Sequence, residues 1–171
     1  IEANFIDTIS SKIILTATGN SSQSIKFQKS GTGLNPKLIS YIGNASIPNS
    51  IGDGFFILSG SDYVTIDGLD LEERSTNTTP TTVMEFGYGL MKTNGNNGCQ
   101  HNLIKNCNIT LNRVQNSGSG FNGSTGIVIL NNTYTSIAIV SVTSNTGSNS
   151  FNKFYNNTIN KRGEKRKYTL Y

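Results

Sequence analysis

The sequence is poor in several residue types that carry catalysis, metal binding or cross-linking. Its 171 residues include no Trp, one His, two Cys and three Pro, and charged residues make up only 14%. A single histidine, His101, excludes a metal site built from several histidines. No G-x-S-x-G segment offers a serine nucleophile. No run approaches the roughly 18 apolar residues of a membrane-spanning helix. These absences leave no predicted catalytic residue and no predicted membrane span.

Two cysteines are too few for a disulfide framework. Two interpretations of them remain open. Cys99 and Cys107 could form one disulfide across the turn between them, or Cys107 could be a buried free thiol.

The charge is unevenly distributed along the chain. Residues 1–160 contain nine Lys and Arg and nine Asp and Glu, so the formal net charge of +4 comes from the segment 161–171. A domain with all its excess charge in one terminal run has no basic groove for nucleic acid. We therefore predict one domain over 1–160, a basic tail over 161–171 and no nucleic-acid partner. Because the chain starts with Ile1 and not Met, we expect a mature product or an excised fragment.

What the chain has in abundance is Asn, Ser and Thr, 62 residues together, with 18 Gly. Asn and Ser are poor helix formers because their side chains compete for backbone hydrogen bonds. The apolar residues are mainly Ile, Val, Phe and Tyr, which favour strands. The composition predicts an all-β protein with many turns.

Three segments resemble one another: "VTIDGLDL" (64–71), "NLIKNCNITL" (102–111) and "NKFYNNTI" (152–159). Aligned without gaps, they share two large apolar positions, the first occupied by Ile66, Ile104 and Phe154 and the second by Leu71, Ile109 and Ile159. Between these lies a bend position, occupied by Gly68, Asn106 and Asn156. Each copy is therefore predicted to be a short strand, a bend and a second short strand.

Further apolar strands precede these copies at 54–60, 83–90 and 126–130, and a less regular coil is expected within 1–50. Strands joined by Asn or Gly bends at intervals of tens of residues are typical of a solenoid. We predict a parallel β-helix of about five coils, whose ends need caps or further coils, so that it is expected to be part of a longer solenoid. Asn side chains at the bends are expected to form a ladder between coils. An antiparallel β-sandwich is the alternative, but it does not need a repeated bend register.

The segments "KSGTGLNPKLISYIGN" (29–44), "DGFFILSGSDYVTIDGLDLEER" (53–74) and "NLIKNCNITLNR" (102–113) resemble the right-handed β-helix surface proteins of Bacteroidetes. The resemblance covers about residues 24–160. It implies type IX secretion, a secreted or outer-membrane surface location and a role in adhesion or carbohydrate binding, with no catalysis in these residues.

A second resemblance is to β-helix polysaccharide lyases, including alginate and chondroitin lyases, in which a "VTIDGL"-like strand also occurs. In those enzymes the catalytic Lys and Arg come from later coils, and a calcium ion neutralises the uronate. No such pair can be matched here. The alternative function is therefore the N-terminal portion of a lyase whose active site lies in later coils.

Four aromatic residues are candidates for binding a polysaccharide or cell-surface glycan, because sugar C–H faces stack on aromatic rings. They are Tyr63, Tyr88, Phe121 and Tyr155. Tyr88 lies between two glycines, and Phe121 lies in a Gly- and Asn-rich segment. A packing role in the coils is the alternative for each.

Two smaller features complete the candidates. Asp67 and Asp70 flank the bend in "DGLD" and could offer oxygens to Ca²⁺, the one cofactor considered; the alternative is that Asp67 caps the turn and Asp70 is solvated. The tripeptide "DTI" (7–9) fits the short O-glycosylation motif of Bacteroidetes, with Thr8 as the modified residue.

Overall fold

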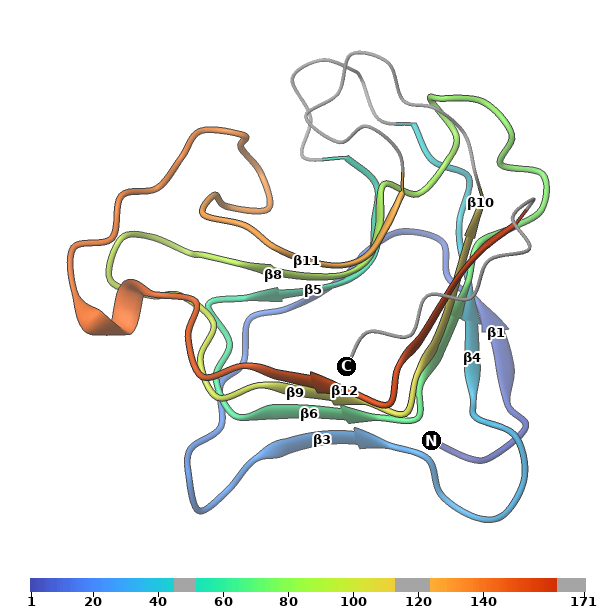
Figure 1. The fold of residues 1–171 in the computed structure, drawn as a ribbon, viewed down its shortest axis with the longest axis horizontal. Helices are drawn as coiled ribbons and strands as arrows, with labels where there is room; N and C mark the ends of the chain where they lie inside the picture. Colours follow the sequence, from blue (N-terminus) through green and yellow to red (C-terminus); the bar gives the residue numbers. More distant parts are fainter. Residues whose placement is uncertain (45–51, 113–123, 163–171) are drawn as a thin grey trace.

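The chain folds into a parallel β-helix, as Figure 1 shows. The computed structural model describes residues 1–44, 52–112 and 124–162. Every pairing between its named strands is parallel, and each strand pairs with the third strand before or after it in the chain. The all-β parallel solenoid is thereby confirmed, and the antiparallel sandwich is excluded.

Three sheets enclose the core. Sheet 1 contains β1 (Ile6–Thr8), β4 (Lys37–Ile39), β7 (Asp70–Glu72), β10 (Asn108–Asn112) and β13 (Thr158–Arg162). Sheet 2 contains β2 (Ile13–Leu15), β5 (Gly54–Ser59), β8 (Phe86–Met91) and β11 (Thr125–Ile129). Sheet 3 contains β3 (Ile25–Gln28), β6 (Val64–Asp67), β9 (Leu103–Lys105) and β12 (Lys153–Tyr155). The described residues thus show four three-strand coils and the first strand of a fifth.

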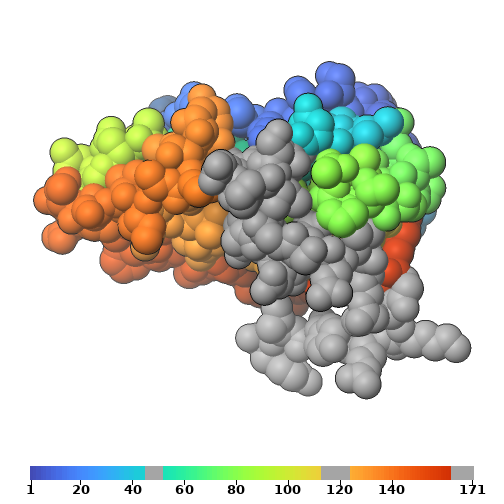
Figure 2. Space-filling view, turned by 90° about the horizontal axis from the view of Figure 1, so that it is seen from above, coloured from blue at the N-terminus to red at the C-terminus, as the bar shows by residue number. Residues whose placement is uncertain are grey.

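The coils wind in the right-handed sense that the resemblance to Bacteroidetes β-helix proteins implies. In Figure 1 the chain passes from sheet 1 to sheet 2 to sheet 3 counter-clockwise. Figure 2 shows the molecule of Figure 1 from above, so the top of Figure 2 is the back of Figure 1. The N-terminal residues, in blue, lie at the top of Figure 2, and the chain therefore approaches the viewer of Figure 1 as it runs toward its C-terminus. A counter-clockwise path that approaches the viewer is right-handed.

The predicted alignment of the three repeated segments matches the strand register. Ile66 pairs with Ile104, and Ile104 with Phe154, in sheet 3. Leu71, Ile109 and Ile159 pair in the same way in sheet 1.

The bend residues between these two positions are also where the pattern places them. Gly68, Asn106 and Asn156 have φ values of 71°, 57° and 54°. Gly reaches this left-handed region without steric cost, and Asn does so more easily than other residues.

The core consists of the inward-facing apolar rows. Ile66, Leu71, Ile104 and Ile109 are almost fully buried, together with side chains of sheet 2 such as Leu90. Burial of each such side chain contributes about 1.5–3 kcal/mol relative to exposure. Exposure rises at the ends of the stack: Phe154, at the position of Ile66 and Ile104, is 37% exposed.

A second apolar cluster lies on the outer side of sheet 2. Ile57, Phe86, Met91 and Val128 pack there beneath Leu130 and Tyr134. This contact holds the start of a long excursion, residues 130–152, which joins β11 to β12 and contains the short 3₁₀ helix η1 (Asn145–Gly147). The excursion, orange in Figure 2, projects to one side of the coils.

Asparagine amides connect successive coils, but the Asn–Asn contact differs from the predicted one. Asn106, at the bend, donates to Asp67 Oδ1 at 2.6 Å. The contact between two Asn side chains lies four residues earlier, where Asn102 Nδ2 donates to Asn152 Oδ1 at 3.1 Å. Asn102 is buried, and its Oδ1 also accepts the backbone N–H of Val64 at 2.9 Å. A buried amide satisfies backbone groups of the preceding coil there, whereas the side chains of Asn106 and Asn156 at the bends are exposed.

Both cysteines are buried free thiols, so the disulfide alternative is not realised. Cys99 Sγ lies within hydrogen-bonding distance of the carbonyl oxygens of Leu58 and Met91. Burial raises the pKa of Cys99 to about 11. The free thiol expected at Cys107 is confirmed.

Among residues 1–44, 52–112 and 124–162, no helix combines the length and apolar character needed to cross a membrane.

Candidate functional site

The outer face of sheet 3 brings together two of the aromatic residues selected from the sequence. Because Val64, Ile66 and Ile104 point inward, their strand neighbours point outward. The strand register arranges the outward residues in two rows that run across the coils. The rows are Lys26, Thr65, Leu103 and Lys153, and then Gln28, Asp67, Lys105 and Tyr155. We call these rows, with the corner residues just before each strand, the sheet 3 face.

A stack of three rings forms one border of this face. Tyr63, His101 and Phe151 occupy equivalent corner positions in successive coils. The ring centroids of Tyr63 and His101 are 4.7 Å apart, as are those of His101 and Phe151, with interplanar angles of 11° and 7°. The spacing follows from the separation of about 4.8 Å between paired strands.

The backbone at these three corners is left-handed, with φ values of 54°, 56° and 58°. That conformation is uncommon for bulky residues and costs on the order of 1–3 kcal/mol at each position. Each stacked pair contributes about 0.5–1.5 kcal/mol, which offsets part of this strain.

The last ring of the stack is open to solvent. Phe151 is 69% exposed, although one face of its ring lies on His101. A ligand that approaches the sheet 3 face can therefore contact the ring of Phe151.

The other border of the face is a row of interacting side chains. Lys105 Nζ lies 3.0 Å from Asp67 Oδ2 and 5.9 Å from the ring centroid of Tyr155. Partial burial acts to raise the pKa of Asp67, but hydrogen bonds from Asn106 and Lys105 outweigh it and the pKa is lowered. The hydrogen bond to Asp67 raises the pKa of Lys105. The two groups are thus charged, and Tyr155, 45% exposed, stands at the outer end of the row.

Phe151, Lys153 and Tyr155 alternate along β12 and its corner, and all three are exposed. We call this series the β12 strip. In the order of the chain, the strip holds two aromatic side chains with an ammonium group between them.

A groove of about 630 Å³ adjoins Phe151 where the excursion meets the sheet 3 corner. Its lining includes Gln100, Asn145, Thr146, Ser148 and Ser150, and Lys and acidic residues are absent from the lining in the described part of the chain.

The groove wall is held by hydrogen bonds. Gln100 Nε2 donates to the Asn145 carbonyl at 2.7 Å and lies 3.1 Å from Ser150 Oγ. Buried Lys92 donates to the carbonyl of Gly147 in η1. Burial lowers the pKa of Lys92. These contacts present amide and hydroxyl groups beside an aromatic ring.

The predicted calcium ligands point to different surroundings. Asp67 belongs to the sheet 3 face, whereas Asp70 begins β7 in sheet 1 and is almost buried. Asp70 Oδ1 accepts hydrogen bonds from Asn35 Nδ2 and the backbone N–H of Asn108, both at 2.8 Å. Within the described residues, no group of three or more His, Cys, Asp or Glu side chains is placed to hold a metal ion. Calcium binding stays a prediction.

Tyr88 is a correction to the sequence-based candidates. Its side chain is 1% exposed, its hydroxyl donates to the Leu69 carbonyl at 2.7 Å and its ring contacts Phe56. Gly87 precedes it where the coils approach closely, since a Cβ on Gly87 would lie 2.6 Å from the carbonyl oxygen of Gly126, whereas a Cβ on Gly89 would meet the Phe86 ring of the same strand. Tyr88 thus offers no ring face to a sugar.

The remaining sequence-based candidates have mixed placements. Tyr63 and Tyr155 lie on the sheet 3 face, the first within the ring stack. Phe121 lies outside the described residues. Thr8 is exposed in β1, and its glycosylation stays a prediction.

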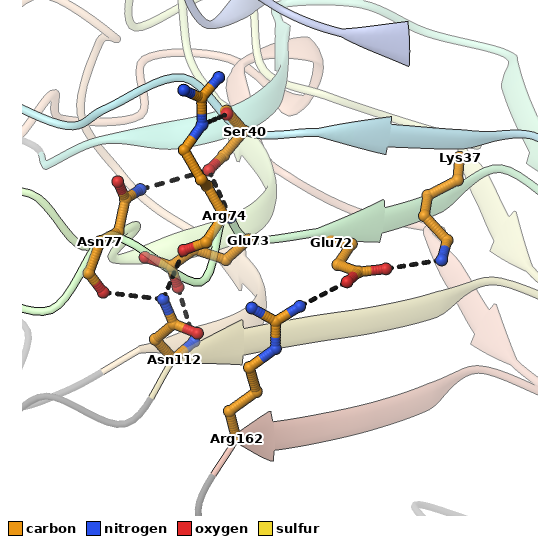
Figure 3. A network of polar contacts seen from close by, with 8 residues as sticks. All are labelled: Lys37, Ser40, Glu72, Glu73, Arg74, Asn77, Asn112 and Arg162. Atoms are coloured by element: carbon orange, nitrogen blue, oxygen red, sulfur yellow. Dashed lines mark hydrogen bonds and ion pairs between the residues drawn. The ribbon is translucent and has the colours of Figure 1, made fainter. Parts of the chain in front are cut away.

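A network of polar contacts on sheet 1 was not foreseen from the sequence (Figure 3). Glu72 bridges Lys37, at 2.6 Å, and Arg162, so ion pairs join β4, β7 and β13. The hydrogen bond from Lys37, opposed by partial burial, lowers the pKa of Glu72. Such surface pairs typically contribute at most about 1 kcal/mol each.

The buried part of the network surrounds Glu73. Its carboxylate accepts the backbone N–H groups of Met84 at 2.8 Å and Asn112 at 2.6 Å. Asn112 Nδ2 donates to the carbonyls of Arg74 and Asn77, both at 2.7 Å. These bonds fasten the segment between β7 and β8 to the coil, which is a structural role. The sequence contained one signal for these hydrogen bonds. Glu73 directly follows the outward-facing Glu72, so strand alternation places a carboxyl group at an inward position, where it needs hydrogen-bond partners.

Comparison of the chain with models of protein families, with curated proteins and with solved structures finds no match. The case for a function therefore depends on the geometry of the sheet 3 face.

Proposed function

We propose that this β-helix is a non-catalytic recognition module that binds a polysaccharide or cell-surface glycan, in adhesion or attachment, through the sheet 3 face. The observation that carries the proposal is the β12 strip. Phe151, at the corner before β12, is 69% exposed, and Tyr155, the last residue of β12, is 45% exposed.

The chemistry of the face suits a sugar. Pyranose rings have C–H faces that stack on aromatic rings, and their hydroxyl groups pair with amide and hydroxyl side chains. Phe151 offers the ring, and the adjoining groove offers Gln100, Ser148 and Ser150. The parallel coils fix these groups on strands and corners, so little ordering is needed when the ligand binds.

We extend the proposal to the setting of the domain. A secreted or outer-membrane surface location is supported by the sequence resemblance to Bacteroidetes β-helix proteins. Further coils of a parent chain are supported by the exposure of Phe154, whose counterparts Ile66 and Ile104 are covered by the next coil.

A glycan array followed by titration of the best ligand tests the proposal. The purified protein is expected to bind, and Phe151→Ala and Tyr155→Ala are each expected to weaken binding several-fold, because one aromatic contact is worth about 0.5–1.5 kcal/mol. Phe5→Ala is the matched control, since Phe5 is 47% exposed and lies in the N-terminal coil.

Equal binding by all four proteins, or no binding to any glycan, would contradict the proposal. Release of unsaturated products from a polysaccharide would favour the lyase alternative instead.

A further inference from the structure

Lysines are concentrated on the sheet 3 face. Lys26, Lys105 and Lys153 lie in its two rows, against Asp67 in the rows and Asp62 at the corner before β6. Residues 1–160 as a whole contain equal numbers of basic and acidic residues. The face therefore has an excess of positive charge that the rest of the domain balances elsewhere.

The three lysines differ in how their ammonium groups are engaged. Lys105 is paired with Asp67 at 3.0 Å. Lys153 is exposed, and within the described parts of the chain its ammonium group has no ion pair or hydrogen bond. Lys26, at the opposite end of the same row, is also exposed. Asp62, at the corner before β6, accepts the backbone N–H of Gln100 at 2.6 Å.

The free ammonium group occupies a defined place. Lys153 begins β12, two residues after the corner residue Phe151 and two before Tyr155, and Tyr155 is about 6.6 Å along the strand from it. An ammonium group binds a carboxylate or sulfate more strongly than a neutral hydroxyl. A ligand whose sugar rings lie on Phe151 and Tyr155 would place an acidic substituent at Lys153.

We infer that the sheet 3 face selects an acidic polysaccharide, with a carboxylate or sulfate group at Lys153 between sugar rings held by Phe151 and Tyr155. The inference rests on the proposed function and adds the ligand class. Nucleic acid fits the face poorly, because a polyanion with a phosphate on every nucleotide requires many basic groups, and acidic residues outnumber basic ones in the rest of residues 1–160.

Titration calorimetry with matched polymers tests the inference. Polygalacturonate is compared with the same polymer after methyl esterification of its carboxyl groups, and dextran sulfate with dextran. The acidic member of at least one pair is expected to bind about tenfold more tightly, with a preference that falls as salt is added. The pair that shows the preference distinguishes carboxylate from sulfate.

Substitutions locate the acidic group. Lys153→Gln is expected to abolish the preference while binding to the neutral polymer persists, and Lys153→Arg is expected to retain it. Lys37→Gln is the matched control, because it removes the same charge from sheet 1. Circular dichroism checks that each variant is folded.

The outcomes separate the two proposals. Equal affinity for acidic and neutral polymers, or a preference that survives Lys153→Gln, overturns this inference and leaves the proposed function intact. Binding of duplex DNA as tight as that of the acidic polymer overturns the assignment to polysaccharide. No binding to any glycan removes the proposed function and this inference together.

Discussion

At the scale of single residues, two kinds of residue adopt the same left-handed backbone conformation at the corners of the coil: Gly or Asn at one corner, and residues with a ring at the other. Gly68, Asn106 and Asn156 turn the chain after the sheet 3 strands, and an aromatic or imidazole ring turns it before them. Gly and Asn tolerate positive φ by themselves. Tyr63, His101 and Phe151 adopt positive φ at positions where each ring stacks on a ring of the adjacent coil.

Asn102 is expected to be the most sensitive of the corner amides. Asn102→Ala would leave the Val64 N–H and the Ser61 carbonyl without their partner inside the protein, at a cost of about 2–4 kcal/mol. Urea denaturation measures this cost. Asn156→Gly is the control and is expected to change stability little, because Asn156 is exposed at a φ of 54° that Gly also adopts. A loss below about 1 kcal/mol for Asn102→Ala would show that water replaces the amide.

At the scale of the element, sheet 3 is a ladder whose outward side chains extend the regularity of its backbone. Rings stack at one border, and a carboxylate, an ammonium group and a phenol ring follow one another at the other. Both series exist because equivalent residues of adjacent coils are about 4.8 Å apart.

His101 is the centre of the ring stack, and its replacement tests what the stack contributes. His101→Asn keeps a residue that accepts positive φ and removes both ring contacts, so a loss of about 1–3 kcal/mol in unfolding free energy is expected. His101→Ala adds the backbone strain and is expected to lose more. Thermal denaturation and the near-ultraviolet dichroism of the tyrosines report the two effects. Equal stability of His101→Asn and the natural protein would show that the stack contributes nothing.

At the scale of the whole molecule, two buried carboxyl groups connect folding to pH. Burial, together with the mutual repulsion of acidic neighbours, raises the pKa of Glu73 to about 7 against the hydrogen bonds from Asn112 and Met84. Burial and the charge of Asp53 raise the pKa of Glu85 to about 7, although a hydrogen bond from Asp53 N–H opposes them. Both groups have an ordinary value of 4.5.

The folded protein therefore binds more protons than the unfolded chain between pH 4.5 and about 7. The free energy of unfolding is expected to fall as pH rises through this window, because the unfolded carboxyl groups ionise first. Urea denaturation at a series of pH values measures the slope. Glu73→Gln keeps a neutral side chain and should reduce the slope; an unchanged slope would exclude Glu73 as its source.

The repeat was readable from the sequence because inward side chains must be apolar and corners must accept positive φ. Those two demands leave a pattern at Ile66, Ile104 and Phe154 and at Gly68, Asn106 and Asn156 that needs no knowledge of distant contacts. The face was only half readable. Tyr63 and Tyr155 were identified as outward aromatic residues, whereas His101 and Phe151 were not. The rings that stack on one another come from different coils: His101 lies 38 residues after Tyr63, and Phe151 lies 50 residues after His101, the same separations as between aligned residues of these coils.

The sequence by itself determined the all-β class, the parallel coil and the register of its strands, since each follows from local alternation and bend chemistry repeated along the chain. Only the tertiary structure decided which side chains meet across coils. Tyr88 is buried because its side chain lies in the core, against the Phe56 ring and the Leu69 carbonyl, whereas Phe151, Lys153 and Tyr155 are exposed. The burial of a side chain and the residues that it contacts depend on parts of the chain far away in sequence, so a local sequence pattern does not predict them.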